Sequence, residues 1–310
     1  WERGATLVSN LLPFALFDVF VLSVAILCAW IVIRARRARA LGGALRGLAT
    51  VAAVIAIWFQ LAWGLNYRRV PIGESLALSA PAGDARAALE RFAAAAAGAA
   101  RASSAELDRT ASFSSSRVIA DLAPAFTRVQ QELGLSAPAR PGRIKRTLFD
   151  PYFRWAAIDG VTNPLVPEIM VVSTLTPAEV HATVAHEWAH LAGYASENEA
   201  SFVGWLVCLE AGGAAAYSGW VFALLKAAGA SPSDARAWIQ RAGPAVVADI
   251  QAMQARYQTS SPVVRSAASA TYDQFLKANR VEGGVRSYDE VLQLMLAAGP
   301  HPAVLEKSGR

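Results

Sequence analysis

The chain has 310 residues, of which 54% are hydrophobic and only 17% are charged. Soluble domains carry about 25% charged residues, so this composition excludes an ordinary soluble globule. Nine Trp, seven Tyr and twelve Phe exclude an intrinsically disordered chain, because they supply ample surface for burial. The net charge of +5 does not indicate a nucleic-acid partner, since the N-terminal basic residues flank apolar segments instead of forming a patch.

Two N-terminal segments are apolar enough to cross a membrane. We expect spans at about residues 7–33 and 47–66, because each supplies the roughly 20 apolar residues that a transmembrane helix needs. A pair of buried core helices is the weaker interpretation. Since the chain starts at Trp1, we expect further sequence upstream, and the second span argues against a cleaved signal peptide.

The loop between the two spans is strongly basic. Cytoplasmic loops are enriched in Arg and Lys, so we expect this loop in the cytoplasm and both ends of the hairpin outside. Arg68 and Arg69 follow the second span and weaken this orientation. The prediction is a hairpin (residues 1–66) in a bacterial inner membrane, with the lipid bilayer as partner and an extracytoplasmic domain after it. The arginines of the loop are Arg34, Arg36, Arg37, Arg39 and Arg46.

Two regions follow the hairpin. Residues 67–137 form a predicted helical lobe, with helices that begin at Asp84 and Ser114, two residue types favoured at helix N-caps. Residues 138–310 form a second predicted region, whose clearest strand is the β-branched run EIMVVS at 168–173. Further helices are expected at about 200–227, 232–258, 263–279 and 287–297. The predicted fold class is mainly α, with a transmembrane helical hairpin followed by an α+β domain that contains a small β-sheet.

The most informative segment is a predicted helix over residues 177–192. Thr176 and Glu179 have the spacing of a capping box, and Pro177 suits the first helical position. Gly193 follows the helix, where a left-handed glycine often ends one. The sequence therefore predicts both ends of this helix from local chemistry.

This helix contains an HExxH motif, His186-Glu-Trp-Ala-His190. Residues four apart lie on one helix face, so the two imidazoles can bind one metal ion. We expect this ion to be Zn²⁺ and Glu187 to take a proton from a water that the metal activates. Incidental spacing is a weak explanation, since the motif holds two of the four His of the chain.

A third ligand is needed, and Glu197 and Glu199 are the candidates from the next segment. The pattern of zincins that use a glutamate ligand places Ala200 after the ligand pair, which favours Glu197. It leaves Glu199 as the alternative ligand or as an outer support of the site. Ser201 then occupies the position where a supporting Asp or Asn is common.

Other candidate site residues lie outside the motif. In zincins an edge strand above the metal helix pairs with extended substrate, so Glu168, Ile169 and Met170 are a possible substrate strand. An ordinary core strand is the equal alternative. Three tyrosines could stabilise an oxyanion, although each also fits a packed tyrosine, and the sequence does not choose between them. They are Tyr217, Tyr272 and Tyr288.

Several stretches of the chain are distinctive when taken together: WGLNYR at 63–68, residues 164–168, HEWAHLAGYASENEASF at 186–202, residues 217–219 and YDQFLKANRVEGGVRSY at 272–288. In these stretches the chain resembles an uncharacterised bacterial membrane family catalogued as domain of unknown function 3810. The family shows Asn where this chain has Ser201, which leaves that supporting contact open. The resemblance implies a membrane-anchored, zincin-like metallopeptidase domain, with residues 138–310 as its catalytic domain, and it supplies no substrate.

The sequence as a whole predicts a membrane-anchored zinc metalloendopeptidase that acts on a peptide or protein substrate. One alternative is a membrane-anchored binding or scaffold protein whose metal site is structural or vestigial. A second alternative, an intramembrane protease, is disfavoured because Glu179, His181 and Thr183 would place polar groups at bilayer depth.

Overall fold

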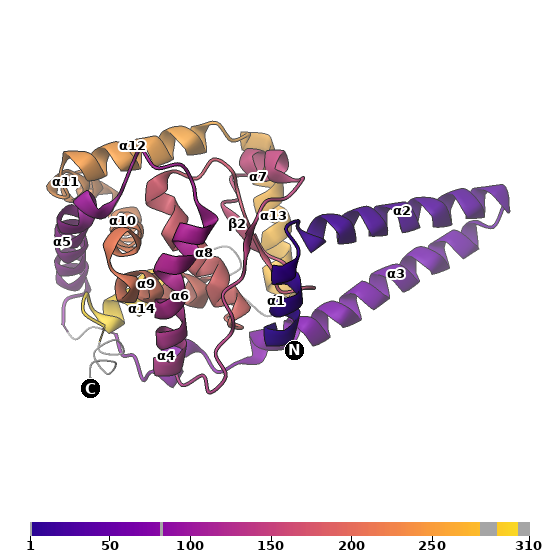
Figure 1. Ribbon diagram of the computed structural model, residues 1–310, viewed down its shortest axis with the longest axis horizontal. Helices are drawn as coiled ribbons and strands as arrows, with labels where there is room; N and C mark the ends of the chain where they lie inside the picture. Colours follow the sequence, from indigo (N-terminus) through magenta and orange to yellow (C-terminus); the bar gives the residue numbers. More distant parts are fainter. Residues whose placement is uncertain (1, 81–82, 280–289, 303–310) are drawn as a thin grey trace.

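The computed structural model describes residues 2–80, 83–279 and 290–302, and in these residues the protein is mainly helical with one small sheet. A helical domain forms one end of the molecule, and a hairpin of two long helices projects from it (Figure 1). The predicted mainly α class with a small sheet is confirmed at this level.

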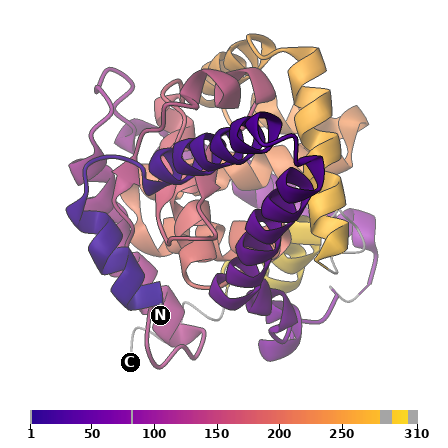
Figure 2. The same ribbon diagram turned by 90° about the vertical axis from the view of Figure 1, so that its right-hand side faces the viewer.

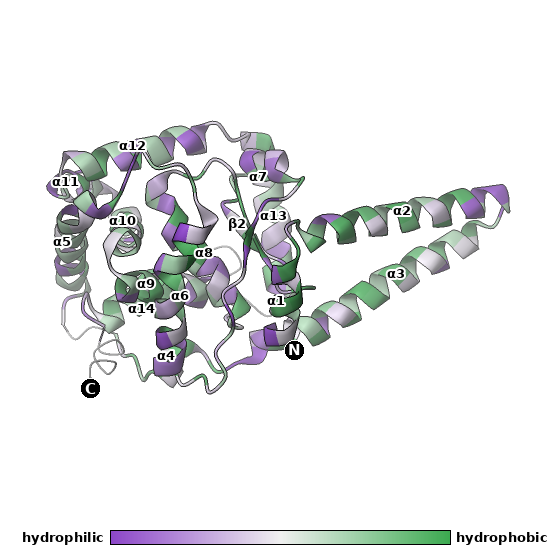
Figure 3. Ribbon diagram, in the orientation of Figure 1, coloured by the Kyte–Doolittle hydropathy of each residue, from purple (hydrophilic) through white to green (hydrophobic). Residues whose placement is uncertain are grey.

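The hairpin consists of α2 (Leu16–Arg37) and α3 (Leu41–Ala62). Each helix has 22 residues, which at 1.5 Å per residue gives about 33 Å, enough to cross a hydrocarbon core of about 30 Å. Almost none of their apolar side chains is buried in the protein, so the interpretation as core helices is wrong. Both helices are apolar along most of their length, and the last turns of α2, at the tip of the hairpin, are hydrophilic (Figure 3).

The first predicted span begins too early. The structure divides the expected segment 7–33 into α1 (Glu2–Leu11) and α2, with Pro13 between them. Proline lacks a backbone N–H and disfavours helical geometry in the residue before it, which explains the break. α1 packs on the domain, where the Asn10 side chain donates to the Pro141 carbonyl at 3.0 Å.

The second span also differs from its predicted bounds. α3 ends at Ala62, and the following residues form the short helix η1 (Gly64–Arg68), so the predicted end at residue 66 is late by one helical turn. This short helix belongs to the domain and leads the chain toward the site.

The remaining helices build the domain around α8 and α9. The predicted caps are present, since the Asp84 side chain accepts from Arg86 N–H and the Ser114 side chain from Arg117 N–H. In chain order the helices are α4 (Ile72–Ser75), α5 (Ala85–Ser103), η2 (Ser104–Glu106), α6 (Ser115–Glu132), α7 (Asp150–Ala156), α8 (Pro177–Leu191), α9 (Glu197–Ala211), α10 (Gly213–Ala230), α11 (Pro232–Arg241), α12 (Pro244–Gln258), α13 (Pro262–Ala278) and α14 (Glu290–Ala298).

Two of the predicted long helices are each divided by a glycine. The expected helix at 200–227 becomes α9 and α10, separated at Gly212 with φ of 73°. The expected helix at 232–258 becomes α11 and α12, separated at Gly243 with φ of 93°. A positive φ suits glycine and ends a helix, so each break has a local cause. The first residues of the expected helix at 287–297 lie outside the described part of the chain.

One hydrophobic core connects the helices before and after residue 137. Phe92 of α5 packs against Trp205 of α9, with ring centroids 6.1 Å apart. Phe126 of α6 packs against Trp188 of α8 at 5.3 Å. The predicted boundary near residue 137 therefore does not separate two hydrophobic cores. Helix α6, which precedes this boundary, packs against α8, which follows it.

The sheet contains β1 (Ile144–Lys145), β2 (Gly160–Thr162) and β3 (Ile169–Val171), in the order β1-β3-β2. β1 pairs with β3 in parallel, and β2 pairs with β3 antiparallel. The interpretation of Glu168, Ile169 and Met170 as an edge strand is wrong, because β3 is paired on both sides and these residues are buried. β2 forms an edge of the described sheet and lies against α8.

Candidate metal centre

α8 begins as its sequence predicts. Pro177 is its first residue, and the Thr176 N–H donates to the Glu179 carboxylate at 2.8 Å. Arg256 of α12 also donates to Glu179, which ties the start of α8 to the domain. After the helix, Gly193 adopts a φ of 84° and turns the chain toward α9, which begins at Glu197.

This turn brings three ligand atoms together at one point. Glu197 Oε2 lies 3.2 Å from His186 Nε2 and 3.5 Å from His190 Nε2, and all three ligand atoms lie within 4.8 Å of one another. In a tetrahedral zinc site with bonds of about 2.0–2.1 Å, neighbouring ligand atoms are about 3.3 Å apart. The donor types and the distances of 3.2 and 3.5 Å fit such a site.

The other ring nitrogens of both imidazoles are also engaged. His190 Nδ1 lies 2.7 Å from the Tyr194 carbonyl, which can only accept, so Nδ1 carries a proton and Nε2, which faces Glu197, is the ring nitrogen available to a metal ion. His186 Nδ1 lies 3.1 Å from Ser201 Oγ, which can accept in the same way. The supporting contact that the sequence left open is therefore made by Ser201.

The electrostatics of the group favour a carboxylate next to the imidazoles. Burial alone would raise the pKa of Glu197, but the imidazoles of His190 and His186 outweigh it and hold that pKa well below its usual range. Burial would lower the pKa of His190, whereas the nearby Glu197 carboxylate raises it to about 9. An anionic ligand thus persists in the interior beside two nitrogen donors.

Glu187 is oriented by the edge strand β2. The Thr162 hydroxyl donates to Glu187 Oε2 at 2.7 Å and lies 2.9 Å from the Glu187 carbonyl. Gly160 permits this close approach, because a Cβ there would lie 2.7 Å from Glu187 Oε1. Burial raises the pKa of Glu187 above its ordinary value, which suits a group that accepts a proton near neutral pH.

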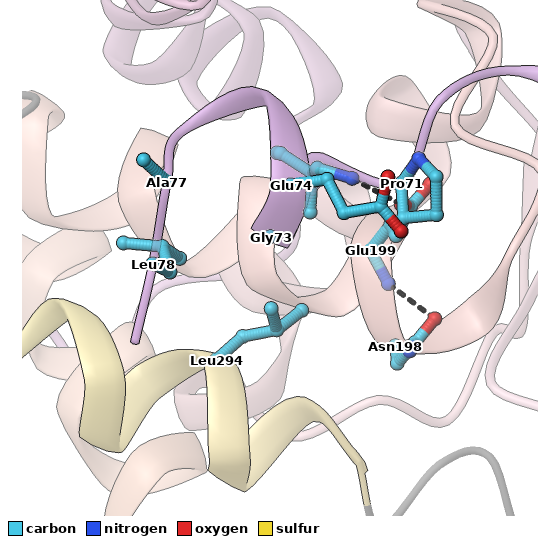
Figure 4. Close-up of a pocket in the computed structure, with 9 residues that line it drawn as sticks. Pro71, Gly73, Glu74, Ala77, Leu78, Asn198, Glu199 and Leu294 are labelled. Carbon is cyan, nitrogen blue, oxygen red and sulfur yellow. Dashed lines mark hydrogen bonds between the residues drawn. The ribbon is translucent and has the colours of Figure 1, made fainter. Parts of the chain in front are cut away.

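Glu199, the alternative third ligand, does not join the group. Its carboxylate accepts the Ile72 N–H at 2.6 Å, beside a pocket of about 410 Å³ between α4, the start of α9 and α14 (Figure 4). Burial raises the pKa of Glu199 above its ordinary value. Glu197 is the glutamate that the structure places with the imidazoles.

Two of the three candidate tyrosines lie in the described residues, and only one of these two contacts the candidate metal ligands. The Tyr272 hydroxyl, from α13, donates to Glu197 and so lies at the site. The Tyr217 hydroxyl donates to Asp249 and also meets Arg109, in a contact between α10 and α12. Tyr288 lies outside the described residues.

Sequence reasoning missed three neighbours of the site. Trp63 packs edge-to-face on His190, with ring centroids 6.0 Å apart, and Thr162 orients Glu187. Burial raises the pKa of Tyr67 to about 12, and the Glu197 carboxylate contributes to this rise. Trp63 and Tyr67 fall in a stretch that matches the family resemblance, whereas no local signal marks Thr162.

The sequence matches one known protein family. Residues 2–296 match the family described as "Protein of unknown function (DUF3810)". Because the match covers nearly the whole chain, the protein belongs to this family. No curated protein and no solved structure matches the chain.

Proposed function

We propose that this member of the DUF3810 family is a membrane-anchored zinc metallopeptidase. The observation that carries the proposal is the convergence of His186, His190 and Glu197 on one point, with Glu187 beside them. Within the described residues this group supplies three ligand atoms. Three protein ligands leave a position open for water and substrate, as in catalytic zinc sites, whereas structural sites are closed by four.

Each residue then has a defined role. When bound, Zn²⁺ would supply Lewis-acid chemistry, making a water more acidic and polarising the scissile carbonyl. Glu187 accepts a proton from the attacking water as the new C–O bond forms, and it delivers a proton to the leaving nitrogen as the C–N bond breaks. Thr162 holds the Glu187 carboxylate in position through its 2.7 Å hydrogen bond.

We assign substrate binding to β2 instead of β3. β2 is an edge of the described sheet and lies beside Glu187, so an extended peptide could pair with its backbone next to the site. The substrate is accordingly a peptide segment in extended conformation.

We place the protein in a bacterial inner membrane with its domain outside the cytoplasm. The support is the hairpin, which carries its arginines at the tip farthest from the domain (Figure 3). By the positive-inside rule the tip faces the cytoplasm.

The test is Glu187→Gln in the full chain, purified in detergent and assayed with a library of quenched fluorescent peptides. The variant should bind one zinc ion as the wild type does and lose hydrolysis. Glu90→Gln, an exposed glutamate of α5, is the matched control and should keep both properties. If the wild type binds zinc but hydrolyses no peptide, the alternative of a scaffold with a structural metal site holds. If Glu187→Gln is as active as the wild type, the assignment of Glu187 as the base is wrong.

A further inference from the structure

The candidate metal centre lies at the root of the hairpin. α3 ends at Ala62, and the next residue, Trp63, packs on His190. Six residues later the Arg69 guanidinium donates to the Ala192 carbonyl at 2.9 Å, at the end of α8. The chain therefore passes from the apolar helix to the metal helix without an intervening linker.

Helix α13 makes a second connection between the site and α3. Its Tyr272 donates to Glu197, and its Phe275 packs edge-to-face on Phe59 of α3, with ring centroids 5.6 Å apart. The two residues are three apart on one helix, which corresponds to about 4.5 Å of helix rise. The ligand glutamate is thus about one helical turn from a side chain of the hairpin.

The other helix of the hairpin is fixed to the domain by buried carboxylates. Glu168 accepts the backbone N–H groups of Leu16 and Phe17, at 2.9 and 2.6 Å, and pairs with Lys145 at 2.8 Å. Asp18 accepts the Leu148 N–H at 2.9 Å. These hydrogen bonds anchor α2, and the contact between Phe59 and Phe275 anchors α3. The fold therefore fixes the distance between the metal centre and the base of the hairpin.

The face of the domain around this root is apolar. α1, α7 and α13 surround the base of the hairpin in both orientations of the ribbon (Figures 1 and 2). Large exposed apolar side chains gather on two of these elements and their borders, and an apolar face beside a membrane helix suits contact with the lipid surface. They are Leu7, Leu11, Phe14, Leu148 and Trp155.

A groove of about 480 Å³ lies between α3, α13 and the loop at Pro164 and Leu165. The Trp58 indole holds this loop against α3 by donating to the Leu165 carbonyl at 3.0 Å. Because one wall consists of α3 residues 52–59, the groove opens at the depth of the apolar hairpin, where its occupant must itself be apolar. Its lining is entirely apolar: Ala52, Ile55, Ala56, Phe59, Pro164, Leu165 and Phe275.

From these relations we infer that the substrates are proteins anchored in the same membrane by a transmembrane helix, cut in the extended segment directly outside that helix. The groove receives the substrate's transmembrane helix, and the following residues reach β2 and Glu187. Because Trp63, the residue after α3, packs on His190, we expect the cut within a few residues of the end of the substrate's transmembrane helix. This inference rests on the proposed function and adds its substrate class.

The experiment uses the full chain in phosphatidylcholine vesicles with three reporter sets that share one randomised eight-residue segment. In the first set the segment directly follows a single transmembrane helix. In the second a rigid helical spacer of about 20 residues lifts it by about 30 Å. The third set consists of free peptides. We expect the first set to be cut at least about tenfold faster than the second, because a tether helps only where its geometry permits engagement.

The outcomes distinguish the two levels of the proposal. If the lifted segments or the free peptides are cut as fast as the first set, the membrane-proximal substrate class is wrong, while the proposed peptidase function still stands. If no set is cut while zinc is bound, the proposed function fails and the substrate class fails with it. Mass spectrometry of the products gives the position of each cut, and cuts distributed far from the transmembrane helix also count against the inference.

Two variants test the groove itself. Ala56→Trp fills the groove from an exposed position of α3, and Val54→Trp places the same side chain elsewhere on that helix. We expect Ala56→Trp to slow the anchored reporters while free peptides and the Val54→Trp control are unaffected. If the groove holds a lipid chain instead, Ala56→Trp will cut anchored reporters at the wild-type rate.

Discussion

The backbone of Gly204 in α9 lies directly against the backbone of His186 in α8, where an added Cβ would come within 2.8 Å of the His186 nitrogen. Glycine is the residue that allows two backbones to approach this closely. The contact matters for the candidate site because α9 carries Glu197 at its first turn, and its distance from α8 decides whether that carboxylate reaches the two imidazoles.

Replacing Gly204 with Ala should therefore separate α8 from α9. We expect the substitution to destabilise the protein by about 1–3 kcal/mol, as overpacking of a core does, and to weaken zinc binding. The control is Gly98→Ala in α5, where a Cβ would meet nothing within 4 Å. It should stabilise by about 0.5–1 kcal/mol. Thermal unfolding and competitive zinc titration measure both effects, and wild-type zinc affinity in Gly204→Ala would contradict the prediction.

The two glutamates of α9 offer a second comparison. Glu197→Gln removes the anionic oxygen that lies 3.2 Å from His186 Nε2, so zinc affinity should fall by more than the roughly 10–100-fold that loss of an outer support costs. Glu199→Gln should bind zinc as the wild type does, because its amide oxygen can still accept the Ile72 N–H. Equilibrium dialysis with metal analysis measures both variants. A larger loss in Glu199→Gln than in Glu197→Gln would reverse the assignment of the ligand.

Local sequence signals predicted the parts of the site that depend on one helix. The HExxH spacing placed His186 and His190 on one face, and Thr176, Glu179 and Gly193 predicted the ends of α8. These signals are reliable because helix periodicity and capping act over a few residues. The glutamate pattern likewise selected Glu197 over Glu199.

Long-range arrangement was beyond the same reasoning. The run at 169–171 is apolar whether it lies at an edge or in the centre, so its sequence could not show that β1 and β2 flank it. Thr162 is 25 residues from Glu187, and no short-range rule connects them. Pro13 and Gly212 are local signals for a helix break, but the strongly apolar residues on either side of each one favour a single continuous helix.

Thr162 should act as a positioning residue for Glu187. Thr162→Val removes the hydroxyl while keeping the shape, and we expect peptide hydrolysis to fall by about 10–100-fold through kcat, with KM and zinc content unchanged. Thr162→Ser keeps a donor and should retain most of the activity. Steady-state kinetics on one peptide cut by the wild type provides the measurement. A Val variant as active as the Ser variant would show that the 2.7 Å hydrogen bond has no role in the reaction.

Removing one partner of the ion pair between Lys145 and Glu168 should strongly destabilise the protein. Both side chains are fully buried, and Lys145 Nζ lies 2.8 Å from Glu168 Oε2. Lys145→Met leaves the Glu168 charge without its cation, which should cost about 3–5 kcal/mol. The exposed pair of Arg86 and Glu90 is the control, and Arg86→Ala should cost at most about 1 kcal/mol. Chemical unfolding in detergent compares the two, and similar losses would contradict the importance of burial.

His181, which is not one of the three ligand residues, provides a pH-dependent test. Its side chain is buried, with Nε2 3.1 Å from Asp121 Oδ2. Burial lowers the pKa of His181 below its usual value, even though the Asp121 carboxylate opposes this and Arg117 adds to it. The folded protein thus binds this proton less tightly than the unfolded chain, whose His pKa is about 6.5.

The resulting stability is fully present above about pH 6.5 and is lost as the pH falls through the lowered folded-state pKa. His181→Gln removes the titrating group, so the wild type should lose stability relative to this variant on going from about pH 7.5 to about pH 5.5. Thermal unfolding of both proteins across this range measures the difference. A difference that stays constant, or that moves in favour of the wild type at low pH, would show that the folded protein binds the His181 proton at least as tightly as the unfolded chain.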